Sequence, residues 1–184
     1  MVFDVESIGL HGEGFSVAWQ VMEWSGSAWM VLDEQWWRCD PALAQGLDSD
    51  RAWVAEQVLP MLDQQLAGAP SVAGECASPA ALRRCFWQSW LSWRARGAWL
   101  VGQCVWPVET NFLSACVRDL GESEHFSGPY PLLDIAAWQV LKGQDPRRPT
   151  PRLVDEQPRH HPMADVRCAA RIARECMTEE VFAR

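Results

Sequence analysis

The first forty residues constrain the fold of this chain most, because they hold three successive segments with the pattern of β-strands. The clearest is residues 15–23, where apolar side chains recur at every second position: Phe15, Val17, Trp19 and Val21. This period of two places them on one face of a strand. Residues 2–9 and 28–39 also favour strands, and turns at 11–14 and 24–27 separate the three segments. We therefore expect a sheet that begins with a hairpin and a third strand.

The rest of the chain combines helical patterns with one more strongly apolar segment. Residues 98–105 are almost entirely apolar, as expected for a central strand covered on both faces. The other predicted elements are a helix over 51–66 (capped by Asp50 and interrupted at Pro60), helices over 78–96, 110–120, 134–142 and from 162 to the end, a short strand at 71–75, and a loop over 144–158. This order predicts an α/β fold with a mixed five-stranded sheet and helices on both faces.

Composition narrows the class of protein. The chain has 184 residues, of which 48% are apolar, and this length suits one domain, residues 1–184, with a sizeable core. The longest apolar run is shorter than the roughly 18 residues that a membrane span needs. The N-terminus has neither a basic region nor a cleavage site. We therefore expect a cytoplasmic protein with no membrane partner.

Cysteine, charge and tryptophan content refine this expectation. The seven cysteines include no C-x-x-C pair, which favours reduced thiols over a disulfide framework or a zinc ribbon. The net charge of −8 argues against tight binding to a long duplex, which needs a broad basic surface.

Twelve tryptophans are present, more than one small core needs. Several of them are therefore expected at a homodimer interface, including Trp36, Trp37, Trp87 and Trp90, and a few could stack on bases.

Asp4 and Glu6 form the first candidate site. Residues two apart point to the same face of a strand, so the two carboxylates lie side by side while Val5 points into the core. Two neighbouring carboxylates repel each other unless a positive charge lies between them. A divalent cation bound by oxygen ligands would meet this need. The alternative is the solvated face of an edge strand.

Two further segments complete a recognisable pattern. The first segment, Asp4-Val5-Glu6-Ser7-Ile8-Gly9-Leu10, is followed by Val108-Glu109-Thr110-Asn111-Phe112-Leu113 and by His160, which four residues separate from Asp165 at a predicted helix start. In this order they resemble the three sequence blocks of the DnaQ-like (DEDDh) 3′-to-5′ exonucleases of the ribonuclease H-like superfamily. The resemblance spans nearly the whole chain. Glu109 departs from it, because the family has an aspartate there.

The resemblance implies a metal-dependent hydrolase. Its metal ligands would be Asp4, Glu6, Glu109 and Asp165, which would hold two Mg²⁺ or Mn²⁺ ions. His160 would be the general base that takes a proton from the attacking water, and an imidazole titrates close enough to neutrality for this task. His161 remains an alternative base. Because Glu109 is one methylene longer than aspartate, it could shift or weaken a bound metal.

The resemblance also implies where substrate binds. Ser7, Ile8, Gly9, Leu10 and Phe112 would contact the terminal nucleotide. The expected substrate is the 3′ end of single-stranded DNA or RNA, from which the enzyme would release nucleoside monophosphates. The expected loop before His160 carries four arginines, either as a solvated surface or as a lip that grips phosphate: Arg147, Arg148, Arg152 and Arg159.

Two other interpretations stay open at this level. One is a weakly active or inactive binding module for nucleic acid or protein on the same fold, favoured by Glu109 and the acidic composition. The other is an unrelated acidic α/β protein, which would leave Asp4, Glu109 and Asp165 far apart.

Overall fold

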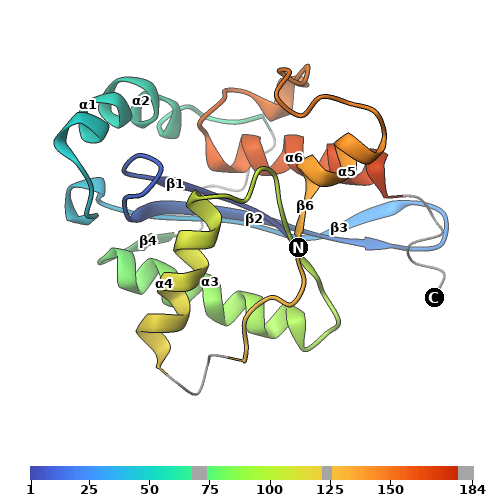
Figure 1. Cartoon of the computed structure of the whole chain (residues 1–184), viewed down its shortest axis with the longest axis horizontal. Coiled ribbons are helices and arrows are strands. Elements are labelled where there is room, and N and C mark those ends of the chain that lie inside the picture. The colour runs from blue at the N-terminus through green and yellow to red at the C-terminus, as the bar shows by residue number, and fades with distance from the viewer. Residues whose placement is uncertain (68–73, 122–125, 178–184) are drawn as a thin grey trace.

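The computed structural model describes residues 1–67, 74–121 and 126–177, and within them a single mixed sheet forms the centre (Figure 1). It has six strands in the order β4-β3-β2-β1-β5-β6. The strands are β1 (Val2–Ser7), β2 (Gly14–Trp24), β3 (Trp29–Cys39), β4 (Gly74–Cys76), β5 (Leu100–Gly102) and β6 (Leu132–Asp134). The α/β class and the mixed sheet are therefore confirmed.

The sheet differs from the expectation by one strand. The predicted five-stranded sheet was too small, because β6 lies where a loop and a helix start were expected. This strand has three residues, which pair in parallel with β5, and such a short segment has no periodicity to detect. β5 itself is shorter than the expected strand over 98–105. The short strand expected at 71–75 begins at Gly74, and residues 71–73 lie outside the described part of the chain.

The first three strands form the antiparallel half of the sheet. β1 pairs with β2, and β2 pairs with β3, which confirms the hairpin and the third strand. β2 is buried on both faces from Gly14 to Val21. The buried hydroxyl of Ser16 is paired there: its Oγ accepts a hydrogen bond of 2.7 Å from the indole N–H of Trp36.

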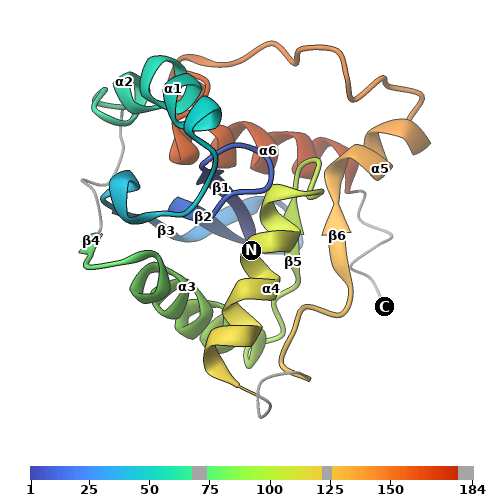
Figure 2. The same ribbon diagram turned by 60° about the vertical axis from the view of Figure 1, so that its left-hand side comes forward.

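Helices cover both faces of the sheet, as predicted (Figures 1 and 2). On one face lies α6, which contacts β1, β2 and β3, together with α5; on the other lie α3 and α4. The helices are α1 (Asp48–Gln57), α2 (Leu59–Leu62), α3 (Pro79–Arg94), α4 (Val108–Leu120), α5 (Ile135–Leu141) and α6 (Pro162–Cys176), with single 3-10 turns η1 (Pro41–Leu43) and η3 (Val154–Glu156).

Several helix boundaries follow from local sequence. The expected interruption at Pro60 is confirmed, since α1 ends before it and α2 begins at Leu59. Asp134 accepts a hydrogen bond from the backbone N–H of Ala136 and so caps α5. The cap predicted at Asp50 is wrong: α1 begins two residues earlier, and Asp50 lies in its first turn.

The tryptophans named for a subunit interface belong to the core. Trp36, Trp87 and Trp90 are buried, and Trp37 packs half-buried against them. These four residues therefore fill the core instead of a subunit interface, and the homodimer itself stays a prediction. Their placement was predicted wrongly because the amount of tryptophan says nothing of where it lies: a sheet covered on both faces has two apolar interfaces to fill.

Candidate metal centre

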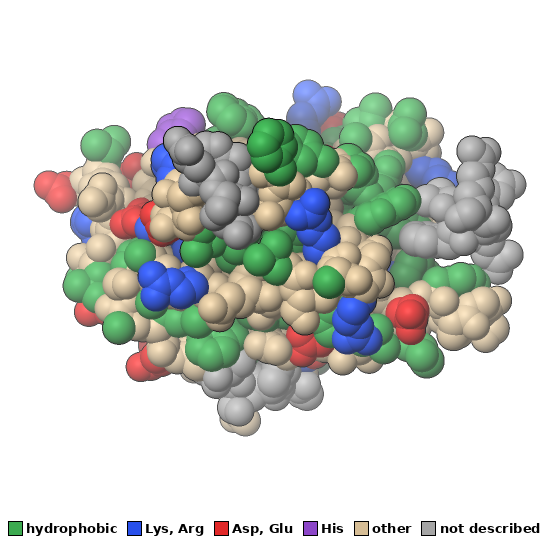
Figure 3. Space-filling view, turned by 90° about the horizontal axis from the view of Figure 1, so that it is seen from below, with side chains coloured by type: hydrophobic (Ala, Val, Ile, Leu, Met, Phe, Trp, Pro, Cys, Tyr) green, Lys and Arg blue, Asp and Glu red, His purple; other side chains and the backbone are tan. Residues whose placement is uncertain are grey.

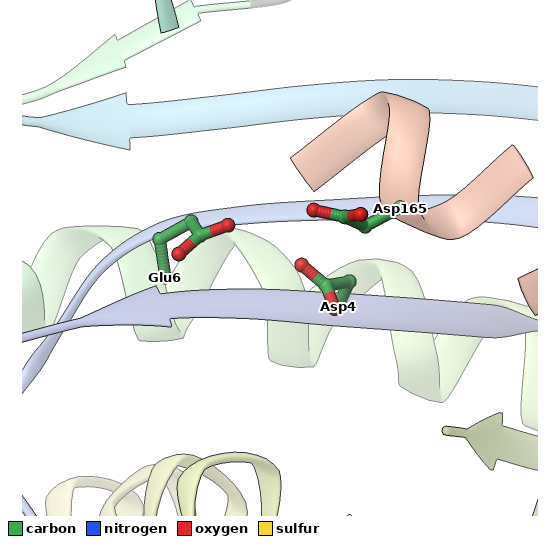
Figure 4. Close-up of side chains that lie close together, drawn as sticks. All are labelled: Asp4, Glu6 and Asp165. Carbon is green, nitrogen blue, oxygen red and sulfur yellow. The ribbon is translucent and has the colours of Figure 1, made fainter. Parts of the chain in front are cut away.

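Three carboxylates from opposite ends of the chain meet on the α6 face of the sheet (Figure 4). Asp4 and Glu6 project from β1, and Asp165 projects toward them from the first turn of α6. One oxygen from each residue lies within 4.8 Å of the other two. All three side chains are half-buried. The structure thus brings together three of the four predicted metal ligands.

The alternation of β1 explains this arrangement. Phe3 and Val5 point into the core beneath α3 and α4, and Phe3 contacts Phe86 at a ring-centroid distance of 5.3 Å. Asp4 and Glu6 must then point to the opposite face, where α6 passes. Asp165 reaches them because α6 begins at Pro162, a residue that suits the first turn of a helix.

The pKa values of the cluster show that the positive charge beside it does not balance the three carboxylates. The pKa of Asp4 is raised well above its usual value by burial and by the charges of Asp165 and Glu6. Burial and neighbouring carboxylates likewise raise the pKa of Glu6 to about 8, and burial raises that of Asp165. Carboxylates in this state repel one another and retain protons. Their oxygens are the ligands that Mg²⁺, Mn²⁺ or Ca²⁺ prefers, so the residues fit a divalent cation.

Glu109 occupies a separate position. It is buried in the first turn of α4 and lines the same cavity, but it does not belong to the group of oxygens within 4.8 Å. Burial raises its pKa to about 7, while the backbone N–H groups of Glu109 and Val5 favour its charged form. The predicted fourth ligand is therefore near the cluster without joining it.

The two adjacent histidines have opposite environments. His160 is exposed and lines the cavity, with its ring against Trp53 at a centroid distance of 5.4 Å. His161 is only 1% exposed and packs on Trp36 at 4.5 Å. Burial lowers the pKa of His161 to about 4. Only His160 of this pair is placed to exchange a proton with a molecule in the cavity.

Three of the five predicted substrate-contacting residues line the cavity. Ser7, Gly9 and Leu10 do so, and Leu10 is 63% exposed. Ile8 and Phe112 do not: both are buried in the main core, where Phe112 contacts Phe86. Direct contact of these two with a substrate is therefore wrong for this structure. Their side chains fill the space beneath the turn that follows β1.

The cavity around the acidic cluster has a volume of about 730 Å³. All four arginines of the segment before His160 line it, so these arginines are not simply a distant surface. Trp53 and Trp106 also line it and are 49% and 74% exposed. Trp53 was not predicted as a cavity residue. Its apolar neighbours Ala52, Val54 and Ala55 give no signal of this position.

Comparisons with protein-family models, with curated proteins and with solved structures found no match for this chain. Among the described residues, no helix is both long enough and apolar enough to cross a membrane.

The acidic cluster also argues against the interpretation as an unrelated acidic protein. That interpretation expected Asp4, Glu109 and Asp165 to lie far apart. Asp4 and Asp165 instead share one group of oxygens.

Proposed function

We propose that this protein is a metal-dependent 3′-to-5′ exonuclease that hydrolyses the terminal phosphodiester bond of single-stranded nucleic acid. The observation that supports this most is the meeting of Asp4, Glu6 and Asp165 within 4.8 Å, on the wall of a cavity that also holds His160. Each carboxylate alone has an ordinary structural explanation. A half-buried group of three beside an exposed imidazole does not stabilise a fold, because burial of like charges is costly.

The residues have distinct tasks in this proposal. Asp4, Glu6 and Asp165 would hold Mg²⁺ or Mn²⁺, in a site for two ions if Glu109 also takes part. A bound divalent ion supplies charge neutralisation for the phosphate and lowers the pKa of a water molecule. His160, exposed in the same cavity, would accept the proton of the attacking water and release it to solvent.

The cavity walls suit the end of a single strand. Trp53 and Trp106 present exposed rings on which bases can stack without sequence preference. Arg147, Arg148 and Arg159 add positive charge to the same cavity and would bind phosphates. On the face shown in Figure 3, the basic side chains of the described residues stand apart from one another. The net charge of −8 favours a grip on a strand end over binding along a duplex.

A second candidate is a nucleic-acid or protein-binding module with little activity. It is favoured by one observation: Glu109 stands outside the group of three oxygens, so a second ion would have fewer protein ligands. In this case the cavity would still bind a strand end, but it would not cleave it.

One experiment separates the two candidates. Single-stranded DNA and RNA oligomers labelled at either end are incubated with Mg²⁺, Mn²⁺ or EDTA, and released mononucleotides are measured. The exonuclease proposal expects metal-dependent shortening from the 3′ end, lost in Asp4→Asn and retained in Glu23→Gln, a carboxylate-to-amide control at an exposed position of β2. Binding of the oligomers without cleavage under all metals would instead support the binding module.

A further inference from the structure

Arg152 contacts the acidic cluster directly. Its guanidinium forms an ion pair with Oδ1 of Asp165, and the side chains of the two residues are 17% and 16% exposed. Arg152 also favours the charged forms of Asp4 and Glu6, whose pKa values it lowers against the effect of burial. It is therefore the positive charge that partly compensates the three carboxylates.

The loop holds Arg152 in this position. Nη1 of Arg152 donates a hydrogen bond of 3.0 Å to the backbone carbonyl of Glu156. Glu156 is 2% exposed, and its carboxylate forms an ion pair of 2.6 Å with Arg171 of α6 and accepts the backbone N–H of Leu153 at 3.0 Å. The segment that carries Arg152 is thus attached to the same helix that presents Asp165, so Arg152 differs from a freely moving surface arginine.

The same carboxylate cannot fully serve two cations. A divalent ion bound among Asp4, Glu6 and Asp165 needs oxygens of Asp165, one of which Arg152 occupies. The ion and the guanidinium also repel each other at this distance. A bound ion therefore weakens the contact between Arg152 and Asp165.

A released guanidinium would have one new partner in the cavity. A phosphate of the substrate would lie close to the carboxylates once a cation neutralises them, and the planar guanidinium binds phosphate through paired hydrogen bonds. We infer that Arg152 is a built-in counter-ion, which occupies Asp165 when no divalent ion is bound and passes to the substrate phosphate when the ion binds. This inference rests on the proposed function, since it assumes that the ligand is a phosphate ester.

The first test measures metal affinity without any reaction. Mn²⁺ is titrated calorimetrically into the wild type, Arg152→Gln, and Arg159→Gln, a control that lines the same cavity but, in the described part of the chain, forms no ion pair with the cluster as Arg152 does. We expect Arg152→Gln to bind Mn²⁺ about tenfold more tightly, because one charge-assisted hydrogen bond no longer has to be broken. Arg159→Gln should change the affinity by less than about threefold, because an exposed charge acts weakly.

The second test measures phosphate binding with the products of the proposed reaction, thymidine and uridine 5′-monophosphate. At saturating Mn²⁺, Arg152→Gln should bind the preferred nucleotide about tenfold more weakly than the wild type, while it binds the metal more tightly. A variant that merely damaged the site would lose both affinities. Arg152→Lys, which keeps the charge without the planar fork, should fall between the two and provides a second variant if Arg152→Gln does not fold.

The outcomes distinguish the two proposals. Weaker Mn²⁺ binding in Arg152→Gln would overturn the inference, since Arg152 would then orient Asp165 for the metal rather than compete with it. Unchanged nucleotide affinity would also overturn it, because the guanidinium would not reach the phosphate. Absence of cleavage in the wild type would refute the exonuclease proposal alone, because neither titration depends on turnover.

Discussion

Replacing Glu6 by glutamine tests whether the three carboxylates repel one another in the metal-free protein. The pKa of Glu6 in the folded chain is about 8, above its ordinary value of 4.5. The folded state therefore binds a proton more strongly than the unfolded state between these two values. By linkage, this contribution to stability is present at low pH and is lost as the pH rises through about 8. Glu6→Gln removes the ionisable group and hence this loss.

The size of the effect follows from the geometry. One oxygen of Glu6 lies within 4.8 Å of oxygens of Asp4 and Asp165. Two unit charges at that distance repel by about 3.5 kcal/mol at an effective dielectric constant of about 20. The attraction of Arg152 offsets part of this repulsion, so we expect Glu6→Gln to stabilise the protein by about 2 kcal/mol at alkaline pH. For a chain of this length, this corresponds to a melting temperature roughly 4–8 °C higher.

The assay is thermal unfolding in EDTA at two pH values, one at about 4, below the ordinary pKa of 4.5, and one at about 9. At the higher pH, Glu6→Gln should melt above the wild type; at the lower pH the difference should nearly vanish, because Glu6 is then largely protonated in both the folded and the unfolded wild type. Glu23→Gln, the exposed control, should change little at either pH. Added Mn²⁺ should stabilise the wild type, by about 2.7 kcal/mol at a hundred times its dissociation constant, and Glu6→Gln far less. The reasoning would be refuted if Glu6→Gln melted no higher than the wild type at the alkaline pH.

Four further substitutions test single side chains. His160→Ala should slow cleavage by about 10²–10⁴-fold without lowering the melting temperature, whereas His161→Ala should cost about 2–4 kcal/mol of stability in urea, as for other large buried side chains; the reverse pattern would contradict both assignments. Glu109→Gln should weaken calorimetric Mn²⁺ binding less than Glu6→Gln, and an equal loss would show that Glu109 reaches the ion. Arg83 forms ion pairs of 2.6 Å with Glu13 and Asp119. Arg83→Met would leave both carboxylates without their partner and should lower the free energy of unfolding by about 3 kcal/mol. An unchanged midpoint of unfolding in urea would contradict this.

Local sequence predicted those features of the site that depend on one element. The alternation of β1 places Asp4 and Glu6 on one face whatever surrounds the strand. The first turn of α6 is recognisable from Pro162, and Asp165 must lie on it. The strands β1, β2 and β3 were also found from their sequence patterns, most clearly β2, in which apolar side chains recur at every second position. Three-residue β6 shows none, and the sixth strand was missed.

Tertiary structure decided everything that depends on which elements meet. Two adjacent histidines differ in sequence only by position, yet packing of α6 against β3 buries His161 on Trp36 and leaves His160 in the cavity. The same packing brings Asp165 to Asp4, and attachment of the preceding loop to α6 brings Arg152 to Asp165. Burial of a side chain and the charge beside it come from residues distant in sequence. For this protein, the sequence therefore determined which groups are available, and only the fold determined which of them act on one another.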